Sequence, residues 1–415
     1  MVDVERCPAE ISAANPKGEQ YVGLWVLARS GGEPRRLITL PFTRERITAD
    51  ELAQYFRGPE FADRPAGAIP PPHAPLISVV VPTTFSREAE LRDCLNALAA
   101  LEYPNFEVLL VDNRPEAADP PAWIADYSRV QVLRERRAGG AAARNAGLAA
   151  AAGEIVAFTD DDVIVDPGWL AAFWRRFEAH PEEAGIGGFM LPKELETEAQ
   201  VAFEDYYDAQ LPRMLETMSH RLERPPARSI FRKATIVEEN DAGETIATFS
   251  LYAAGRLGPG QSRAFRTTAL RAIGGFDYRL GTGFGEDILL WARLLWHGYT
   301  IGYEPAALVY HTHRRSLDEL RRQIGNYGAG FTATKLALVL EDPRHLGALA
   351  VIAPRAALVL SRTFWDRLRS SAKGSQRTVV EDIHTSELAR AELRGMLRGP
   401  AMYVHSAWTA RRWRP

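Results

Sequence analysis

The stretch Gly153-Glu154-Ile155-Val156-Ala157-Phe158-Thr159-Asp160-Asp161-Asp162 decides how this 415-residue chain is interpreted. Its apolar run, residues 155–159, is typical of a strand buried in a parallel sheet, and it ends directly in three aspartates. Adjacent carboxylates repel one another and are costly beside an apolar strand, and a divalent cation would remove that cost. Taken alone, the triplet is also compatible with a solvated acidic turn or a helix cap.

Strands and helices alternate upstream of this stretch. Three apolar runs predict strands, at residues 77–82, 106–111 and 130–133. Two segments predict helices, the stripe of Leu91, Cys94, Leu95 and Leu98 and the alanine-rich segment 141–152, with Gly153 as the expected C-cap of the second. This alternation predicts an α/β fold around a mostly parallel sheet. Pro82, Asp112 and Asp160 all follow strands, and we expect them to converge because ligands bind at the carboxyl ends of such strands.

Smaller regions flank this α/β domain, which we expect over residues 77–315 with a nucleotide-binding half (77–162) and an acceptor half (163–315). Residues 1–63 predict a β/α module, with two strands around the turn at residues 31–34 and a helix that Thr48 caps. Residues 64–76 contain five prolines and predict a semi-rigid linker. Residues 316–415 predict helices at 317–340, 346–368 and 378–397, interrupted by glycines and Pro354.

Composition excludes several classes of protein. A net charge of −3 gives no global basic field for nucleic acid. Two cysteines, Cys7 and Cys94, cannot make a disulfide framework or a cysteine metal site. The first residues lack the pattern of a signal peptide, and no unbroken apolar run reaches the ~18 residues of a membrane span. We therefore expect a location in the cytoplasm, at the inner face of the membrane if the apolar and arginine-rich C-terminal helices reach it.

Two further groups of residues can do chemistry. Glu286 and Asp287 open the apolar helical stretch 288–295 after a glycine-rich approach, and a carboxylate there is favoured by the helix dipole whether it acts as a cap or as a base. His311 and His313 follow the apolar run 307–309. We expect these two histidines to point to opposite sides, so that only one of them faces a metal ion.

Several of these segments together resemble a family-2 glycosyltransferase with the GT-A fold. The matching pieces are residues 79–83, 103–113, 140–147, 153–162, 266–277 and 285–313. They follow one another in the family's order over about 240 residues. In the loop Gln261-Ser262-Arg263 the chain departs from the family, many members of which place an asparagine or similar group there, so no sugar preference follows.

The resemblance implies a role for each matching residue. Pro82 and Thr83 would line the pocket for the nucleobase, Asp112 would accept a hydrogen bond from it, and Arg144 would lie near the diphosphate. Asp160 and Asp162 would face the metal directly or through water, Asp161 would lie nearer the ribose or sugar, and the family's spacing makes His311 the better histidine ligand. Asp287, beside Glu286, would be the general base of an inverting transfer.

We therefore predict a glycosyltransferase of glycan or cell-envelope biosynthesis in a bacterium, dependent on Mn²⁺ or Mg²⁺, with a nucleotide-sugar donor. The acceptor is open between a glycan, a lipid-linked molecule and a small molecule. One alternative is a nucleotidyltransferase-like sugar-phosphate enzyme, against which the order of Glu286-Asp287 and His311 argues. The other is a non-catalytic sugar-binding or assembly subunit, against which the retention of Asp160, Asp162 and Asp287 argues.

Overall fold

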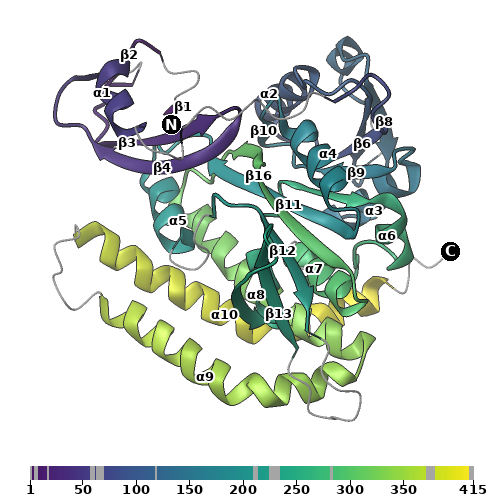
Figure 1. Cartoon of the computed structure of the whole chain (residues 1–415). Coiled ribbons are helices and arrows are strands. Elements are labelled where there is room, and N and C mark those ends of the chain that lie inside the picture. Colours follow the sequence, from purple (N-terminus) through teal and green to yellow (C-terminus); the bar gives the residue numbers. More distant parts are fainter. Residues whose placement is uncertain are drawn as a thin grey trace.

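The computed structural model describes residues 2–3, 8–15, 18–56, 61, 70–116, 119–208, 214–223, 234–280, 284–370 and 379–410. Figure 1 shows a twisted central sheet with helices packed against it, the N-terminal strands beside one end of the sheet, and three long C-terminal helices along its lower edge. The strand order of the large sheet is β14-β13-β12-β16-β11-β15-β9-β6-β7-β8, and β10 pairs with β16.

Four parallel strands form the nucleotide-binding half, as the apolar runs predicted. They are β6 (Ile77–Thr83), β7 (Phe106–Asp112), β8 (Val130–Arg134) and β9 (Ile155–Phe158). The predicted helices are α2 (Glu88–Ala99) and α3 (Gly140–Ala150), and the short helical segment η4 (Ala122–Asp126) precedes β8. Gly153 is not the C-cap of α3, because that position belongs to Ala151. The backbone N–H of Gly153 instead donates to Ser78 Oγ at 2.8 Å in the turn before β9.

The other half of the sheet is mixed. Its strands are β10 (Val163–Val165), β11 (Glu183–Pro192), β12 (Met218–Leu222), β13 (Thr235–Asn240), β14 (Thr245–Ser250), β15 (Arg263–Arg266) and β16 (Thr300–His311). Its helices are α4 (Trp169–Ala179), α5 (Glu198–Asp208), η5 (Leu251–Leu257), α6 (Thr267–Ala272) and α7 (Glu286–Trp296). β15 runs antiparallel to both of its neighbours, β9 and β11, and so joins the two halves of the sheet. Trp169 is fully buried and packs edge-on against Phe173.

The N-terminal module packs on this second half of the sheet. The predicted hairpin is β3 (Gly23–Ser30) and β4 (Glu33–Pro41), accompanied by β1 (Val2–Asp3), β2 (Glu10–Ser12), β5 (Arg46–Thr48), α1 (Ala49–Ala53) and η2 (Gln54–Phe56). The predicted capping box of Thr48 and Glu51 is present. Leu27 packs with Leu308 of β16, and Arg29 forms a buried ion pair with Asp166 at 2.7 Å. Residues 64–69 of the proline-rich linker lie outside the described residues.

Three long helices form the C-terminal region, α8 (Leu317–Glu341), α9 (Arg344–Ser370) and α10 (Val379–Ala410). Two expectations about them were wrong, because α9 runs through Pro354 and α10 continues beyond residue 397 through Pro400. Close packing of α10 on α8 explains the second difference. A Cβ at Gly395 or Gly399 would lie only 1.8 Å or 2.2 Å from a backbone oxygen of α8, so these glycines let the backbones touch.

His345 makes the junction of α8 and α9 sensitive to acid. It is buried, the hydroxyl of Tyr252 lies 3.0 Å from its Nδ1, and burial lowers its pKa to about 4. Because the folded pKa lies below that of the unfolded chain, the stability it contributes is present above about pH 6.5 and is lost as the pH falls towards 4. We expect the wild type to lose up to about 2 kcal/mol more than His345→Asn between pH 7.5 and pH 5. The free energy of unfolding of both proteins is measured in urea at the two pH values. If the wild type and His345→Asn lose the same amount between pH 7.5 and pH 5, the prediction is contradicted.

Candidate active site

The aspartate triplet lies where β9 ends and the chain turns into β10. β10 then runs antiparallel to the end of β16, with Val163 opposite His311. The backbone N–H of Thr312 donates to the carbonyl oxygen of Asp162 at 3.1 Å. This pairing brings Asp162 and His311 together, although 148 residues lie between them in the sequence.

Arginines already neutralise the triplet. Arg87, at the start of α2, bonds to Asp161 at 2.6 Å and also to Asp162, and Arg144 of α3 bonds to Asp160 at 2.6 Å. Burial raises the pKa of Asp161 to about 6, despite the nearby Arg87. Burial also opposes ionisation of Asp162, but His311 and Arg87 outweigh it and hold its pKa well below the usual range. The repulsion expected from the sequence is therefore relieved by side chains, so it does not by itself require a cation.

The start of α7 supplies the second acidic group. Gly285 adopts a φ of 93° as the N-cap, and a Cβ there would lie 3.0 Å from the side chain of Thr334, so the turn requires glycine. Glu286 accepts a bond of 2.8 Å from Arg144, and burial raises its pKa. Asp287 Oδ1 accepts from the backbone N–H of Ile288 at 2.8 Å. Arg144 therefore connects α7 to the triplet. Residues 281–283, which belong to the predicted glycine-rich approach, lie outside the described residues.

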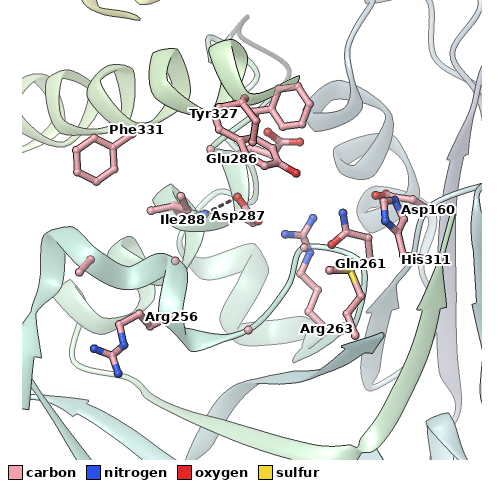
Figure 2. Close-up of a pocket in the computed structure, with 18 of the residues that line it drawn as sticks. Asp160, Arg256, Gln261, Arg263, Glu286, Asp287, Ile288, His311, Tyr327 and Phe331 are labelled. Carbon is pink, nitrogen blue, oxygen red and sulfur yellow. Dashed lines mark hydrogen bonds between the residues drawn. The ribbon is translucent and has the colours of Figure 1, made fainter. Parts of the chain in front are cut away.

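These groups share one pocket of about 370 Å³. Figure 2 shows Asp160 and His311 on one side, Glu286 and Asp287 nearby, and Phe331 on the far side. The catalytic and donor-site candidates that line it are Arg144, Asp160, Glu286, Asp287 and His311. Its remaining wall is rich in aromatic and apolar side chains, among them Phe203, Tyr206, Tyr252, Ile288, Ile324, Tyr327 and Phe331.

The expectation that His311 and His313 point to opposite sides was wrong. Residues two apart in an extended segment share a face, and the two Nδ1 atoms lie 2.9 Å apart. His313 is buried behind His311, and its Nε2 bonds to Glu204 of α5. A carboxylate only accepts, so the Nε2 of His313 donates to Glu204. An imidazole that ligates a metal ion is neutral, so in a metal-bound state the Nδ1 of His313 would accept from His311, which would leave a lone pair on His311 Nε2 for the ion.

The side chains present fit a divalent ion in part. His311 Nε2 lies 3.5 Å from Asp162 Oδ1, and this lone pair and carboxylate oxygen are suitable ligands for Mn²⁺. Asp160 stands apart from them, since its carboxylate faces Arg144. Among the described residues, one set of three possible ligands, His180, Glu182 and Glu183, has ligand atoms within 4.8 Å of one another. Glu183 of that set is already bonded to Arg176 at 2.6 Å, so we assign no ion to it.

The residues predicted for the nucleobase lie one and two strands away from β9, on β6 and β7. Thr83, at the end of β6, donates to Asp161 at 2.8 Å, and Pro82 before it is half-buried. Asp112, at the end of β7, is buried and bonds to Arg114 at 2.7 Å and to Arg134 at 2.6 Å. Burial opposes ionisation of Asp112, but the bonds from Arg114 outweigh it and lower its pKa. These three residues do not line the pocket of Figure 2.

Sequence reasoning missed three residues of this region, Arg87, Glu204 and Arg263. Arg87 precedes a predicted helix and carries no motif that distinguishes it from a solvated arginine. Glu204 lies in a segment that resembles nothing we recognised, and only the fold brings it to His313. Arg263 was noticed as a departure from the family pattern, but that signal could not show its position in the pocket.

The mostly parallel sheet and the acidic strand end define the class, an α/β domain of the GT-A type. Residues 78–236 match the family model described as glycosyl transferase family 2. This part of the chain resembles that family.

Known proteins similar to the chain carry matching descriptions. The pre-mycofactocin glycosyltransferase of Mycobacterium tuberculosis is 29% identical over 311 residues, which cover 72% of this chain and 57% of that protein. Glycosyltransferase GlyG of Streptococcus pneumoniae is 32% identical over 120 residues, 28% of this chain and 39% of that protein. The matches thus span 57% and 39% of the lengths of these two relatives. A solved mannosyltransferase, PcManGT from Pyrobaculum calidifontis with GDP-Man and Mn²⁺, is 19% identical, covers 87% of this chain and 94% of that one, and has a TM-score of 0.45.

Proposed function

We propose that the protein transfers a glycosyl group from a nucleotide-diphosphate sugar to an acceptor hydroxyl, with inversion at the anomeric carbon. The observation that carries this proposal is the convergence of Asp160, Asp287 and His311, from three separate elements, on one pocket. The match of residues 78–236 to the glycosyl transferase family 2 model supports glycosyl transfer. The names of the relatives leave both the donor and the acceptor of this protein open.

Asp287 is the proposed general base. Its carboxylate lines the pocket at the start of α7, and one oxygen is held by the backbone of Ile288. The other oxygen can take the proton from the acceptor hydroxyl as that hydroxyl attacks the sugar. Glu286, held by Arg144, binds and orients the donor beside it. The aromatic wall around Tyr327 and Phe331 would exclude water from the attacked carbon, which favours transfer over hydrolysis.

Asp162 and His311 would hold a divalent ion directly, and Asp160 would reach it through water. Bound there, the ion would offset negative charge on the leaving diphosphate. Arg144 lies on the same side of the pocket and can bind phosphate oxygens through its guanidinium. Thr83 positions Asp161 between these groups and the proposed nucleobase site at Asp112.

A thermal-shift screen tests the donor site. The purified protein is heated with uridine, guanosine, adenosine, cytidine and thymidine diphosphates, each with Mn²⁺, with Mg²⁺ or with chelator. We expect at least one nucleotide to raise the unfolding temperature, and more so with a metal ion, because a ligand of the folded state stabilises it. The mass of the product formed from the matching nucleotide sugar then identifies the transferred group. No shift with any nucleotide would contradict the proposal.

We also propose that α9 lies on an anionic membrane surface. Residues 344–362 form the one candidate membrane span among the described residues, yet only 11% of its 18-residue apolar window is buried. One face packs inward through Ala348 and Ile352. The opposite face exposes Leu346 and Leu358, by 62% and 50%. A helix that is apolar on both faces needs a second apolar partner, and the inward packing argues for a helix lying in the interface plane rather than a span.

Charge favours lipid as that partner. Residues 344–362 contain three arginines and no aspartate or glutamate, which suits anionic headgroups. We expect the protein to sediment with phosphatidylcholine vesicles that contain phosphatidylglycerol, and both Leu358→Glu and Arg355→Glu/Arg362→Glu to weaken this binding about tenfold or more. Ile246→Glu, at an equally exposed site on β14, is the control. Unchanged sedimentation of the variants would refute lipid contact, and a dimer dissociated by Leu358→Glu would identify a second copy as the partner instead.

A further inference from the structure

Arg263 is a buried cation whose charge the described side chains do not pair. It is the first residue of β15 and lies in the middle of the sheet, opposite Phe158 on one side and Gly187 on the other. Only 1% of its surface is exposed, and its Nε and Nη1 atoms have no hydrogen-bond partner in the part of the chain that the structure describes. Backbone pairing on both sides fixes the position from which this side chain extends.

The guanidinium of Arg263 points into the pocket beside the catalytic candidates. Figure 2 shows its nitrogens directed towards Asp287, with Gln261 on the other side. No carboxylate forms an ion pair with it among the described residues, although Asp160, Glu286 and Asp287 are near enough to favour its charged form. Burial and the charge of Arg144 oppose this and lower its pKa to about 10, so Arg263 remains a cation at neutral pH.

The guanidinium groups of Arg263 and Arg144 both lie over the ring of Phe276. Their guanidinium carbons lie 5.0 Å and 5.9 Å from the centroid of Phe276. Arg144 is neutralised by Asp160 and Glu286, whereas Arg263 has no such partner among the described side chains. A buried charge without a partner is costly unless a ligand supplies one. Unsatisfied buried donors that face a cavity therefore indicate a ligand that accepts hydrogen bonds.

We propose that Arg263 binds an oxyanion of the donor, either its diphosphate or a carboxylate on its sugar. The planar guanidinium offers parallel N–H groups, which match the two oxygens of a phosphate or carboxylate. Its place beside Arg144 and Asp160 assigns it to the donor side of the pocket, and its nearness to Asp287 places the anion close to the reacting carbon. This inference rests on the proposed function. It adds that the donor carries a negatively charged group where it contacts Arg263.

The test measures dissociation constants by calorimetry in the presence of Mn²⁺. The ligands are the nucleoside diphosphate that stabilises the wild type most, and its glucose and glucuronate derivatives, which differ only in the carboxylate at C6. We expect Arg263→Met to weaken binding of at least one ligand about tenfold or more, and Arg263→Lys to recover part of the loss. A loss for all three ligands identifies the diphosphate as the anion, and a loss confined to the glucuronate identifies the carboxylate.

Stability gives an independent readout. Removing an unpaired buried charge should raise the unfolding temperature of ligand-free Arg263→Met above that of the wild type, so that weaker binding cannot be ascribed to misfolding. Arg92→Met replaces a half-buried arginine that lies outside the pocket, and should change neither quantity. Binding of all three ligands by Arg263→Met as tight as by the wild type would overturn the inference. Failure of the wild type itself to bind any nucleotide would instead overturn the proposed function.

Discussion

Asp287→Asn is expected to lower kcat by about 100- to 10,000-fold, the usual contribution of a general base. Asparagine has nearly the same shape, and its Oδ1 can still accept the bond that Ile288 N–H now gives to Asp287. The start of α7 should therefore be preserved, and nucleotide affinity should stay close to that of the wild type. The amide cannot take a proton from the acceptor, so the loss should fall on the transfer step.

Two further variants make this result specific. Asp318→Asn changes an exposed carboxylate in the first turn of α8, a position equivalent in its helix, and should leave kcat unchanged. Glu286→Gln weakens the contact with Arg144 and should raise the KM for the donor more than it lowers kcat. If Glu286→Gln abolishes turnover while Asp287→Asn retains it, Glu286 is the base and our assignment is wrong.

His313→Leu is expected to weaken Mn²⁺ binding by about 10- to 100-fold, although His313 does not line the pocket. With a metal ion bound, Glu204 and His313 would hold His311 in the tautomer whose Nε2 lone pair faces the ion beside Asp162. Leucine cannot accept the hydrogen bond from His311, so the imidazole loses its fixed orientation and tautomer. Electron paramagnetic resonance of free Mn²⁺ measures the affinity directly, without relying on turnover.

A second buried histidine–glutamate pair provides the matched control. His220 bonds to Glu238 at 3.0 Å between β12 and β13, away from the pocket. His220→Leu should lower stability in a comparable way and leave Mn²⁺ affinity unaltered. His313→Asn, whose side-chain oxygen can accept from His311, should restore part of the affinity that His313→Leu loses. Equal Mn²⁺ affinity in His313→Leu and the wild type would refute the positioning role.

Local patterns in the sequence determined much of the nucleotide-binding half. The runs that form β6, β7 and β9 are apolar because both faces of a parallel strand are buried, and this signal needs no knowledge of distant residues. The capping box at Thr48 and the acidic start of α7 are local for the same reason, since they depend on residues three or four positions apart. The order of these motifs also sufficed to indicate the family.

Long-range packing decided what the sequence left open. The length of α10 depends on glycines that fit against α8. The exposure of α9 depends on which of its side chains other elements contact. The two histidines share a face because they are two residues apart in an extended segment, and the partner of His313 comes from α5, more than a hundred residues earlier. Hydrogen-bond partners of this kind are set by the fold, and no periodic pattern in the nearby sequence indicates them.

The aspartate triplet shows both what local sequence determines and what tertiary packing decides. Its sequence determined a strand end rich in carboxylates, because an apolar run and three adjacent acids are recognisable without any other part of the chain. Tertiary structure decided how the three differ: Asp160 faces Arg144, Asp161 is held by Thr83, and Asp162 lies beside His311. These differences arise because the sheet brings charges together from α2, α3 and β16, and the interaction of charges depends on distance in space rather than separation along the chain.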